Sequence, residues 1–285
     1  MASLKEIKGR IASVQSTQKI TSAMRMVASA KLHRTQQMTQ NFLVYIDEMK
    51  SIVEKLGHSV DSEKSAEPTR IALIPISSGS GLCGAFNSNI AKATKAAISE
   101  YESKGINVQL IPIGKKILHD LKKEGIDCVE DFCLSAEEVG KGDAFAACCR
   151  LVTYIQEQIS AGEMDSAEFI YHHFLSMGKQ VVTRESLDLN VPQLQTLKKE
   201  EKEFITEPDE NELLAELHPK MLNSKVYGII LDSVTSEHAA RMMAMQTADD
   251  NAKELLQELT LLYNKSRQQA ITNELIDIMG GKVSN

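Results

Sequence analysis

The sequence predicts an α/β domain inserted between two long terminal helices, which we expect to pair as an antiparallel coiled coil. Roughly the first 57 and the last 60 residues favour helix and lack the caps and breakers that divide a chain into short helices. Between them, strand-like and helix-like runs alternate. At about 1.5 Å per residue, either helix would be far longer than a compact domain of this size. The helices must therefore pack on each other or be enclosed by other chains.

The composition is that of a globular protein. Its 285 residues are 42% hydrophobic and 25% charged, with no apolar run long enough to cross a bilayer and no apolar signal core in the first ten residues. The 5 cysteines include no CxxC pair, which indicates reduced, buried thiols. His172 and His173 lie in a strand-like run, where neighbours face opposite sides, so a joint metal site is not expected. We predict no metal, no cofactor and a cytoplasmic-type chain.

Positive charge is concentrated at the start of an otherwise acidic chain. Residues 1–34 hold seven Lys or Arg against one Glu, although the whole protein carries a net charge of −7. A basic helix of this kind could bind nucleic acid, anionic lipid or an acidic protein. The segment contains no aromatic residue that could stack on bases, and small residues line it instead. This favours an acidic protein partner.

The N-terminal helix, residues 1–57, carries an interrupted seam of apolar residues. The 3-and-4 spacing of a coiled coil is present in two sets: Leu4, Ile7, Ile11 and Val14, then Phe42, Tyr45, Met49, Ile52 and Leu56. Gln18 and the polar run 33–41 separate the two sets. We expect this helix to have one partner over part of its length and a looser environment elsewhere.

Residues 68–208 form the predicted inserted domain, after a polar connector at 57–68. The expected strands are 70–77, 107–114, 127–132, 167–175 and 180–189, and the expected helices are 87–104, 115–123 and 144–161. Strand–helix alternation predicts a mostly parallel, Rossmann-like sheet covered by helices. A short turn at 177–179 adds an antiparallel hairpin at its edge.

The C-terminal segment, residues 209–285, is predicted to be one helix from Pro219 to Gly280 and Gly281. Its seam is Met245, Ala248, Ala252, Leu255, Leu259 and Leu262. This seam supplies the partner that the N-terminal helix needs. Residues 263–274 are rich in hydrogen-bonding groups, and this tip has no partner within the chain if the N-terminal helix is shorter.

A glycine-rich turn offers an alternative function. Residues 79–84 spell GxGxxG between a predicted strand and a helix, as in dinucleotide-binding folds. However, the second strand is followed by Lys115 and Lys116 rather than by the acid that would bind a ribose, and the terminal helices stay unexplained. We interpret the motif as a tight turn. A dinucleotide-binding enzyme and a free-standing coiled-coil adaptor are kept as alternatives, separable by NADH binding and by self-association.

The residues at the two ends resemble the gamma-subunit family of F-type ATP synthase. Residues 7–34 are similar to that family's N-terminal signature, and residues 236–245 and 250–281 to its C-terminal one. The resemblance implies a non-catalytic rotating shaft that couples proton flow through a membrane ring to the catalytic beta subunits. It also implies that the alpha, beta and epsilon subunits and the ring of c subunits are partners. The expected location is peripheral, on the cytoplasmic face of a bacterial inner membrane.

The resemblance carries over to individual residues. Those implied to contact the ring of alpha and beta subunits are Arg10, Lys19, Met24, Arg25, Lys31, Arg241, Arg267, Gln268, Thr272 and Glu274. Those implied to lie at the rotor ring are Phe204, Thr206 and Glu207. This chain departs from the family pattern at Gly79 and Ser80, where the family has Asp–Arg. It departs again at Phe204 and Thr206, where the family has two tyrosines.

Overall fold

A computed structural model describes residues 3–55, 68–132, 143–187 and 210–281. The chain divides into two compact units. We call Met1–Ser29 with Arg241–Asn285 the helical unit, and Ala30–Ala240 the sheet unit.

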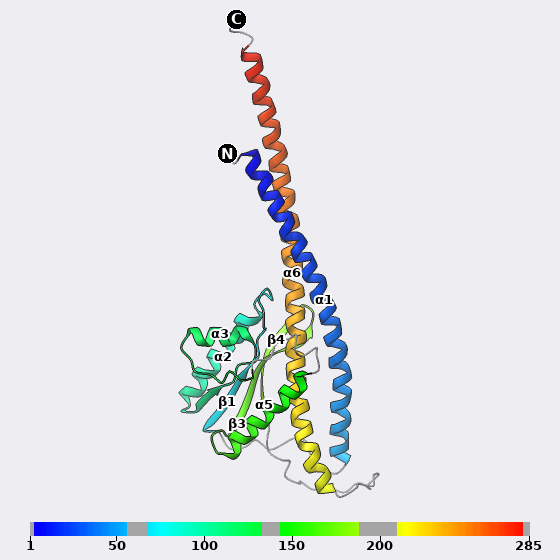
Figure 1. Ribbon diagram of the computed structural model, residues 1–285, viewed down its shortest axis with the longest axis vertical. Coiled ribbons are helices and arrows are strands. Elements are labelled where there is room, and N and C mark those ends of the chain that lie inside the picture. The colour runs from blue at the N-terminus through cyan, green and yellow to red at the C-terminus, as the bar shows by residue number, and fades with distance from the viewer. Residues whose placement is uncertain (1–2, 56–67, 133–142, 188–209, 282–285) are drawn as a thin grey trace. The chain divides into compact units, whose positions relative to one another are not determined.

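Two long helices run at the ends of the chain, as predicted (Figure 1). Helix α1 spans Leu4–Lys55 and helix α6 spans Glu210–Gly281. The prediction that the second helix begins after Pro219 was wrong, because Pro219 lies inside α6. A proline in a helix interior costs about 3 kcal/mol. The buried residues that follow, from Leu222 to Ile230, offset that cost by packing into the core.

The sheet unit contains a mixed sheet of four strands in the order β2-β1-β3-β4. The strands are β1 (Arg70–Pro75), β2 (Asn107–Leu110), β3 (Ser166–Ser176) and β4 (Lys179–Leu187). Strand β1 pairs in parallel with β2 and β3, and β3 pairs antiparallel with β4. This confirms the predicted parallel sheet with an antiparallel hairpin at its edge.

Helices cover both faces of the sheet. One face packs on α2 (Phe86–Ser103) and α3 (Lys115–Lys123), through a core that includes Leu73, Ile90 and Ile117. The other packs on α5 (Asp143–Ser160) and on the first half of α6, through a core that includes Phe169, Leu151 and Ile230. Figure 1 shows α2 and α3 on the opposite side of the sheet from α6. The sheet is therefore a middle layer.

Two strand predictions needed correction. Residues 127–132 form no strand, and their link to the sheet is a hydrogen bond from the Val129 N–H to the Leu110 carbonyl. Strand β2 ends at Leu110 rather than at residue 114, and only an isolated bridge between Ile76 and Ile113 continues the pairing. Pro112, which has no N–H to give to a ladder, lies at this break.

Helices α1 and α6 run antiparallel within the sheet unit. The hydroxyls of Thr39 and Thr235 lie 3.4 Å apart, whereas Phe42, further along α1, stacks edge-on against Tyr227, earlier in α6, at 4.9 Å. Gly228 on α6 faces α1, since a Cβ at this position would lie 3.6 Å from Ile46 Cδ1, an ordinary van der Waals contact.

Burial along α1 follows one unbroken 3-and-4 spacing that the sequence did not reveal. Its buried or half-buried positions are Ile7, Ile11, Val14, Gln18, Thr21, Arg25, Ala28, Leu32, Thr35, Thr39, Phe42, Ile46, Met49 and Val53. Gln18 and Thr35 therefore continue the seam rather than interrupt it. Two predicted seam residues, Tyr45 and Ile52, are 49% and 42% exposed, so their assignment was wrong. Leu56 lies outside the described residues.

In the helical unit, the seam of α6 also differs from the predicted one. Met245, Ala248, Ala252 and Leu259 are buried or half-buried as expected, but Leu255 and Leu262 are 43% and 47% exposed. The buried or half-buried spacing is instead Met245, Asp249, Ala252, Leu256, Leu259, Tyr263, Ser266 and Ala270. The observed seam thus contains Leu256 and Tyr263 where Leu255 and Leu262 were predicted.

Candidate functional site

The basic residues at the start of α1 are presented to solvent. Lys5, Lys8, Arg10, Lys19, Lys31 and Arg34 are all exposed. Arg10 lies 3.6 Å from Glu6, one turn earlier in the same helix. An exposed pair of this kind contributes about 0 to 1 kcal/mol, so it leaves the Arg10 guanidinium available to a partner. Within the helical unit, Lys5, Lys8, Arg10 and Lys19 can form a positive surface for an acidic protein.

Arg25 differs from these residues because it is half-buried in the helical unit. Its guanidinium donates a hydrogen bond from Nη1 to Oε1 of Gln246 on α6. Gln246 in turn donates to Asp250 at 2.7 Å, and this hydrogen bond is the main reason that the pKa of the Asp250 carboxyl lies below its usual value. Arg25 thus belongs to a polar contact between the two helices.

The same stretch of α6 buries a carboxylate that the sequence analysis passed over. Asp249 is 2% exposed and forms an ion pair with Lys253 at 2.8 Å. Lys253 also lies 3.3 Å from Asp250. Asp249 and Lys253 are four residues apart, and this helical spacing is the signal that could have revealed their ion pair.

The predicted contact residues on α6 lie in two settings. Arg241 is half-buried, as is Met24 on α1. Arg267, Gln268, Thr272 and Glu274 are exposed near the end of α6, where the Thr272 hydroxyl donates to the Gln268 carbonyl at 2.8 Å. Phe204, Thr206 and Glu207 lie outside the described residues.

Large apolar side chains accompany these polar ones at the end of α6. The most exposed are Leu261 (72%), Ile271 (49%), Leu275 (56%), Ile276 (60%), Ile278 (65%) and Met279 (72%). Exposed apolar residues gathered on one element are typical of a surface that binds another protein. We call residues 261–279 the apolar tip.

The glycine-rich turn joins β1 to α2 and is filled by its own side chains. The Ser78 N–H donates to Oδ1 of Asn87 at 3.0 Å, and the Ser78 hydroxyl donates to the same oxygen at 2.9 Å. The Asn87 amide donates to the Cys83 sulfur at 3.2 Å. Gly84 has φ 60, in the left-handed region that suits glycine. These contacts fit a tight strand-to-helix turn.

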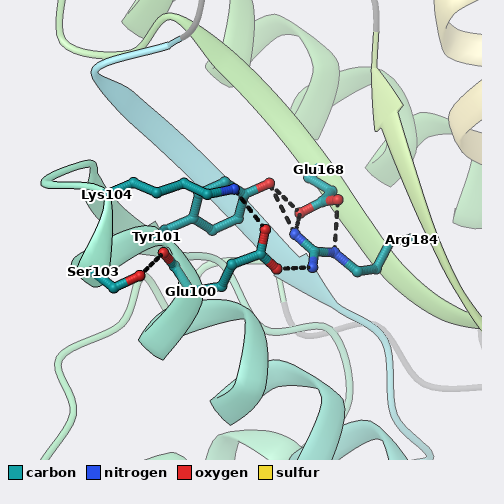
Figure 2. A network of polar contacts seen from close by, with 6 residues as sticks. All are labelled: Glu100, Tyr101, Ser103, Lys104, Glu168 and Arg184. Atoms are coloured by element: carbon teal, nitrogen blue, oxygen red, sulfur yellow. Dashed lines mark hydrogen bonds and ion pairs between the residues drawn. The ribbon is translucent and has the colours of Figure 1, made fainter.

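A polar network ties α2 to β3 and β4 (Figure 2). Arg184 on β4 contacts Glu168 on β3 at 2.9 Å and Glu100 on α2 at 2.6 Å. Tyr101 donates its hydroxyl to Glu168 at 2.8 Å. Hydrogen bonds from Lys104 and Arg184 lower the pKa of Glu100 to about 2. The network fixes the α2 side of the sheet, and the sequence analysis gave no role to these residues.

The described residues include no helix with both the length and the apolar character needed to span a membrane. They also contain no group of three or more His, Cys, Asp or Glu side chains placed to hold a metal ion.

Comparison with known proteins gives a consistent result over the whole chain. The sequence profile of a family described as ATP synthase matches residues 3–284. The ATP synthase gamma chain of Parabacteroides distasonis is 45% identical over 99% of this chain and 98% of its own. That of Phocaeicola vulgatus is 44% identical over 100% of both.

Solved structures share the fold. A chain in the Euglena gracilis mitochondrial ATP synthase, determined with OSCP, F1 and c-ring, matches with a TM-score of 0.64 at 18% identity, covering 99% of this chain and 94% of that one. A chain in the central stalk and c-ring structure of the Tetrahymena thermophila enzyme matches with a TM-score of 0.55 at 24% identity, covering 80% and 99%. Taken together with the near-complete matches in sequence, these results mean that the chain belongs to the ATP synthase gamma chain family and is a non-catalytic subunit of that complex.

Proposed function

We propose that this protein is the rotating shaft of an F-type ATP synthase, coupling ion flow through a membrane ring to the conformational cycle of the catalytic beta subunits. The observation that carries the proposal is the apolar tip: Leu275, Ile278 and Met279 are more than half exposed on a helix that continues beyond its packed half. A helix with such a surface needs a sleeve supplied by other chains.

The two long helices are proposed to act as an antiparallel coiled coil. Residues 1–57 and 209–285 would form the shaft, and residues 68–208 a Rossmann-like foot. The 3-and-4 burial spacing in both α1 and α6 supports this arrangement, because it is the spacing at which coiled-coil helices keep one face together. Knobs-into-holes packing would give the shaft resistance to twisting.

The positive surface of α1 is proposed to meet acidic loops of the alpha and beta subunits. Arg10, Lys19 and Lys31 are exposed and can form ion pairs there. Exposed pairs are individually weak, so they can guide rotation without stopping it. Met24, Arg25 and Arg241 would contribute to the same contact from half-buried positions. At the tip, Arg267, Gln268, Thr272 and Glu274 would contact the ring's inner loops.

The foot is proposed to sit on the epsilon subunit and the ring of c subunits. Phe204, Thr206 and Glu207 would lie at the c-ring. The Euglena and Tetrahymena structures that share this fold contain a c-ring, which supports the proposal. The protein would then be peripheral, on the cytoplasmic face of a bacterial inner membrane.

Reconstitution tests this function. Alpha and beta subunits from the same source would be combined with and without the chain, and ATP hydrolysis measured. We expect hydrolysis to be far faster with the chain, because rotation carries each beta subunit through its open and closed states. A matched variant that ends after residue 262 would lack most of the apolar tip, and it should stimulate ATP hydrolysis less than the full chain does. Equal rates with and without the full chain would overturn the proposal.

A further inference from the structure

Among the described residues, no strand pairs with the end of β3 on one of its edges. Strand β1 pairs with β3 only as far as Ile170, whose carbonyl accepts from the Ile76 N–H at 2.8 Å. The chain then turns away into the glycine-rich turn. Because backbone groups alternate in direction along a strand, His172 and Phe174 present their N–H and C=O groups to the same edge as Ile170. Strand β4 pairs with the other edge.

Helix α6 supplies the missing partners through two side chains. The Ser236 hydroxyl donates to the His172 carbonyl at 2.9 Å, and the Asp232 carboxylate accepts from the Phe174 N–H at 2.9 Å. Asp232 and Ser236 are one helical turn apart, so they lie on one face of α6. We call these two residues the β3 clasp.

Asp232 holds β3 a second time through a side chain. Its other oxygen accepts from His173 Nδ1 at 2.6 Å. His172 points to the opposite face, where its ring stacks on Phe86 with centroids 4.1 Å apart. The expectation that the two histidines face opposite sides is thereby confirmed. The Asp232 carboxylate thus hydrogen-bonds to both the backbone and a side chain of β3.

The clasp differs in kind from the apolar contacts around it. The core between the sheet and α6 includes Phe169, Ile230 and Val234. Burial of such side chains resists separation but is not directional. Hydrogen bonds depend on distance and angle, so they resist sliding of one element along another. Asp232 and Ser236 are placed to resist shear between β3 and α6.

We infer that the β3 clasp is the joint through which torque passes between the sheet and α6. The inference rests on the proposed rotary function, in which the sheet belongs to the part driven by the membrane ring. Lys225 joins α6 to β4 instead: it lies 3.3 Å from both Glu185 and the Ser186 carbonyl, in an ion pair that solvent weakens. Asp232 and Ser236 are positioning residues: they touch no substrate and act by holding β3.

The test compares two activities of the same variants. ATP hydrolysis by the complex of alpha, beta and this chain places no load on the sheet, whereas ATP-driven proton pumping by the complete complex in vesicles does. For Asp232→Ala we expect hydrolysis close to that of the unsubstituted complex and pumping lower by at least about twofold, because a charged acceptor and its hydrogen bonds are lost. Asp232→Asn retains an oxygen that can accept from the Phe174 N–H and should pump better than Asp232→Ala.

Glu216→Ala is the matched control. Glu216 is an exposed carboxylate on the same helix, paired with Lys220 at 3.3 Å within α6. Its removal should leave both activities unchanged. If the complex with Asp232→Ala fails to assemble, Ser236→Ala replaces it in the test. This variant loses one hydroxyl, and its pumping should also fall more than its hydrolysis.

Three other outcomes would be decisive. The inference would be overturned if Asp232→Ala pumped protons as well as the Glu216→Ala control. The same holds for Ser236→Ala where it replaces Asp232→Ala in the test. An equal fall in pumping and hydrolysis would also overturn it, because that pattern indicates a structural role alone. If the unsubstituted chain does not stimulate hydrolysis by alpha and beta, the proposed function itself fails, which separates the two failures.

Discussion

The two halves of helix α6 have similar chemistry and opposite surroundings. In the sheet unit, Leu231 and Val226 are fully buried, and Val234 is 6% exposed. In the helical unit, Leu261, Leu275 and Met279 are between 56% and 72% exposed. Both halves carry apolar side chains throughout, so composition alone does not decide which of them is covered.

The difference separates folding from assembly. The first half buries its apolar side chains against the sheet and α5, and this burial stabilises the chain by itself. The apolar tip contributes little to that stability, since its side chains stay in water. A change in the first half should therefore be visible in the isolated protein, whereas a change in the tip should be visible only in the complex.

The largest expected effect is that of Leu231→Ala. Leu231 is 0% exposed, and a cavity left by its side chain should lower the free energy of unfolding by about 3 kcal/mol. Leu275→Ala makes the same chemical change at a side chain that is 56% exposed, and it should alter stability by less than about 0.5 kcal/mol. Urea denaturation of the isolated chain measures both. Similar losses for the two variants would contradict the division between the halves.

The next effect concerns pH and belongs to the sheet unit. Burial lowers the pKa of His172 to about 4, below its usual 6.5. The folded state therefore favours the neutral ring, and the unfolded chain takes up the proton first. Stability should fall as pH decreases from about 6.5 to about 4, by on the order of 2 kcal/mol.

His172→Phe isolates that contribution. Phenylalanine keeps a ring to stack on Phe86 but has no titrating group in this range. Unfolding measured at several pH values should show a smaller loss between pH 6.5 and 4 in this variant than in the unsubstituted chain. Identical pH profiles would mean that His172 does not cause the loss.

A smaller effect is expected from the network on the other face of the sheet. Glu168→Gln removes the charge that Arg184 and Tyr101 both contact, and it should cost about 1 to 2 kcal/mol. The matched change Glu216→Gln affects an exposed pair within α6 and should cost about 0.5 kcal/mol or less. Thermal unfolding of the two variants provides the comparison. Equal shifts would mean that the network contributes no more than a surface pair.

Most elements of the sheet unit could be predicted from the sequence, because each has a distinct period. Helix α3 was predicted with its observed ends, and the hairpin of β3 and β4 within a few residues. Residues 127–132 were wrongly predicted as a strand because a short segment with apolar residues can lie beside a strand and make a hydrogen bond to it, here from Val129 to Leu110, without forming a ladder. Strand pairing depends on the neighbour, which local sequence does not specify.

The register of the long helices could not be predicted for a different reason. At Leu255 and Leu256 two apolar residues are adjacent, so identity does not show which one is covered. The structure half-buries Leu256 and exposes Leu255, and it buries the charged Asp249 in the same row. The clasp formed by Asp232 and Ser236 was equally hidden, since it depends on where β3 ends relative to α6. Tertiary packing selects these positions.

The smallest expected effect lies in the helical unit, at the contact of Arg25 with Gln246. Arg25→Ala should lower the free energy of unfolding of the isolated chain by about 1 kcal/mol, because one charged hydrogen bond to Gln246 is lost at a half-buried site. Gln246→Ala should cost about as much, and the double variant less than the sum, since the two residues share one interaction. Arg10→Ala is the control, as Arg10 is exposed and pairs only with Glu6 among the contacts described for it. Denaturation of all four variants gives the coupling energy. Strict additivity would mean that the contact does not stabilise the helical unit.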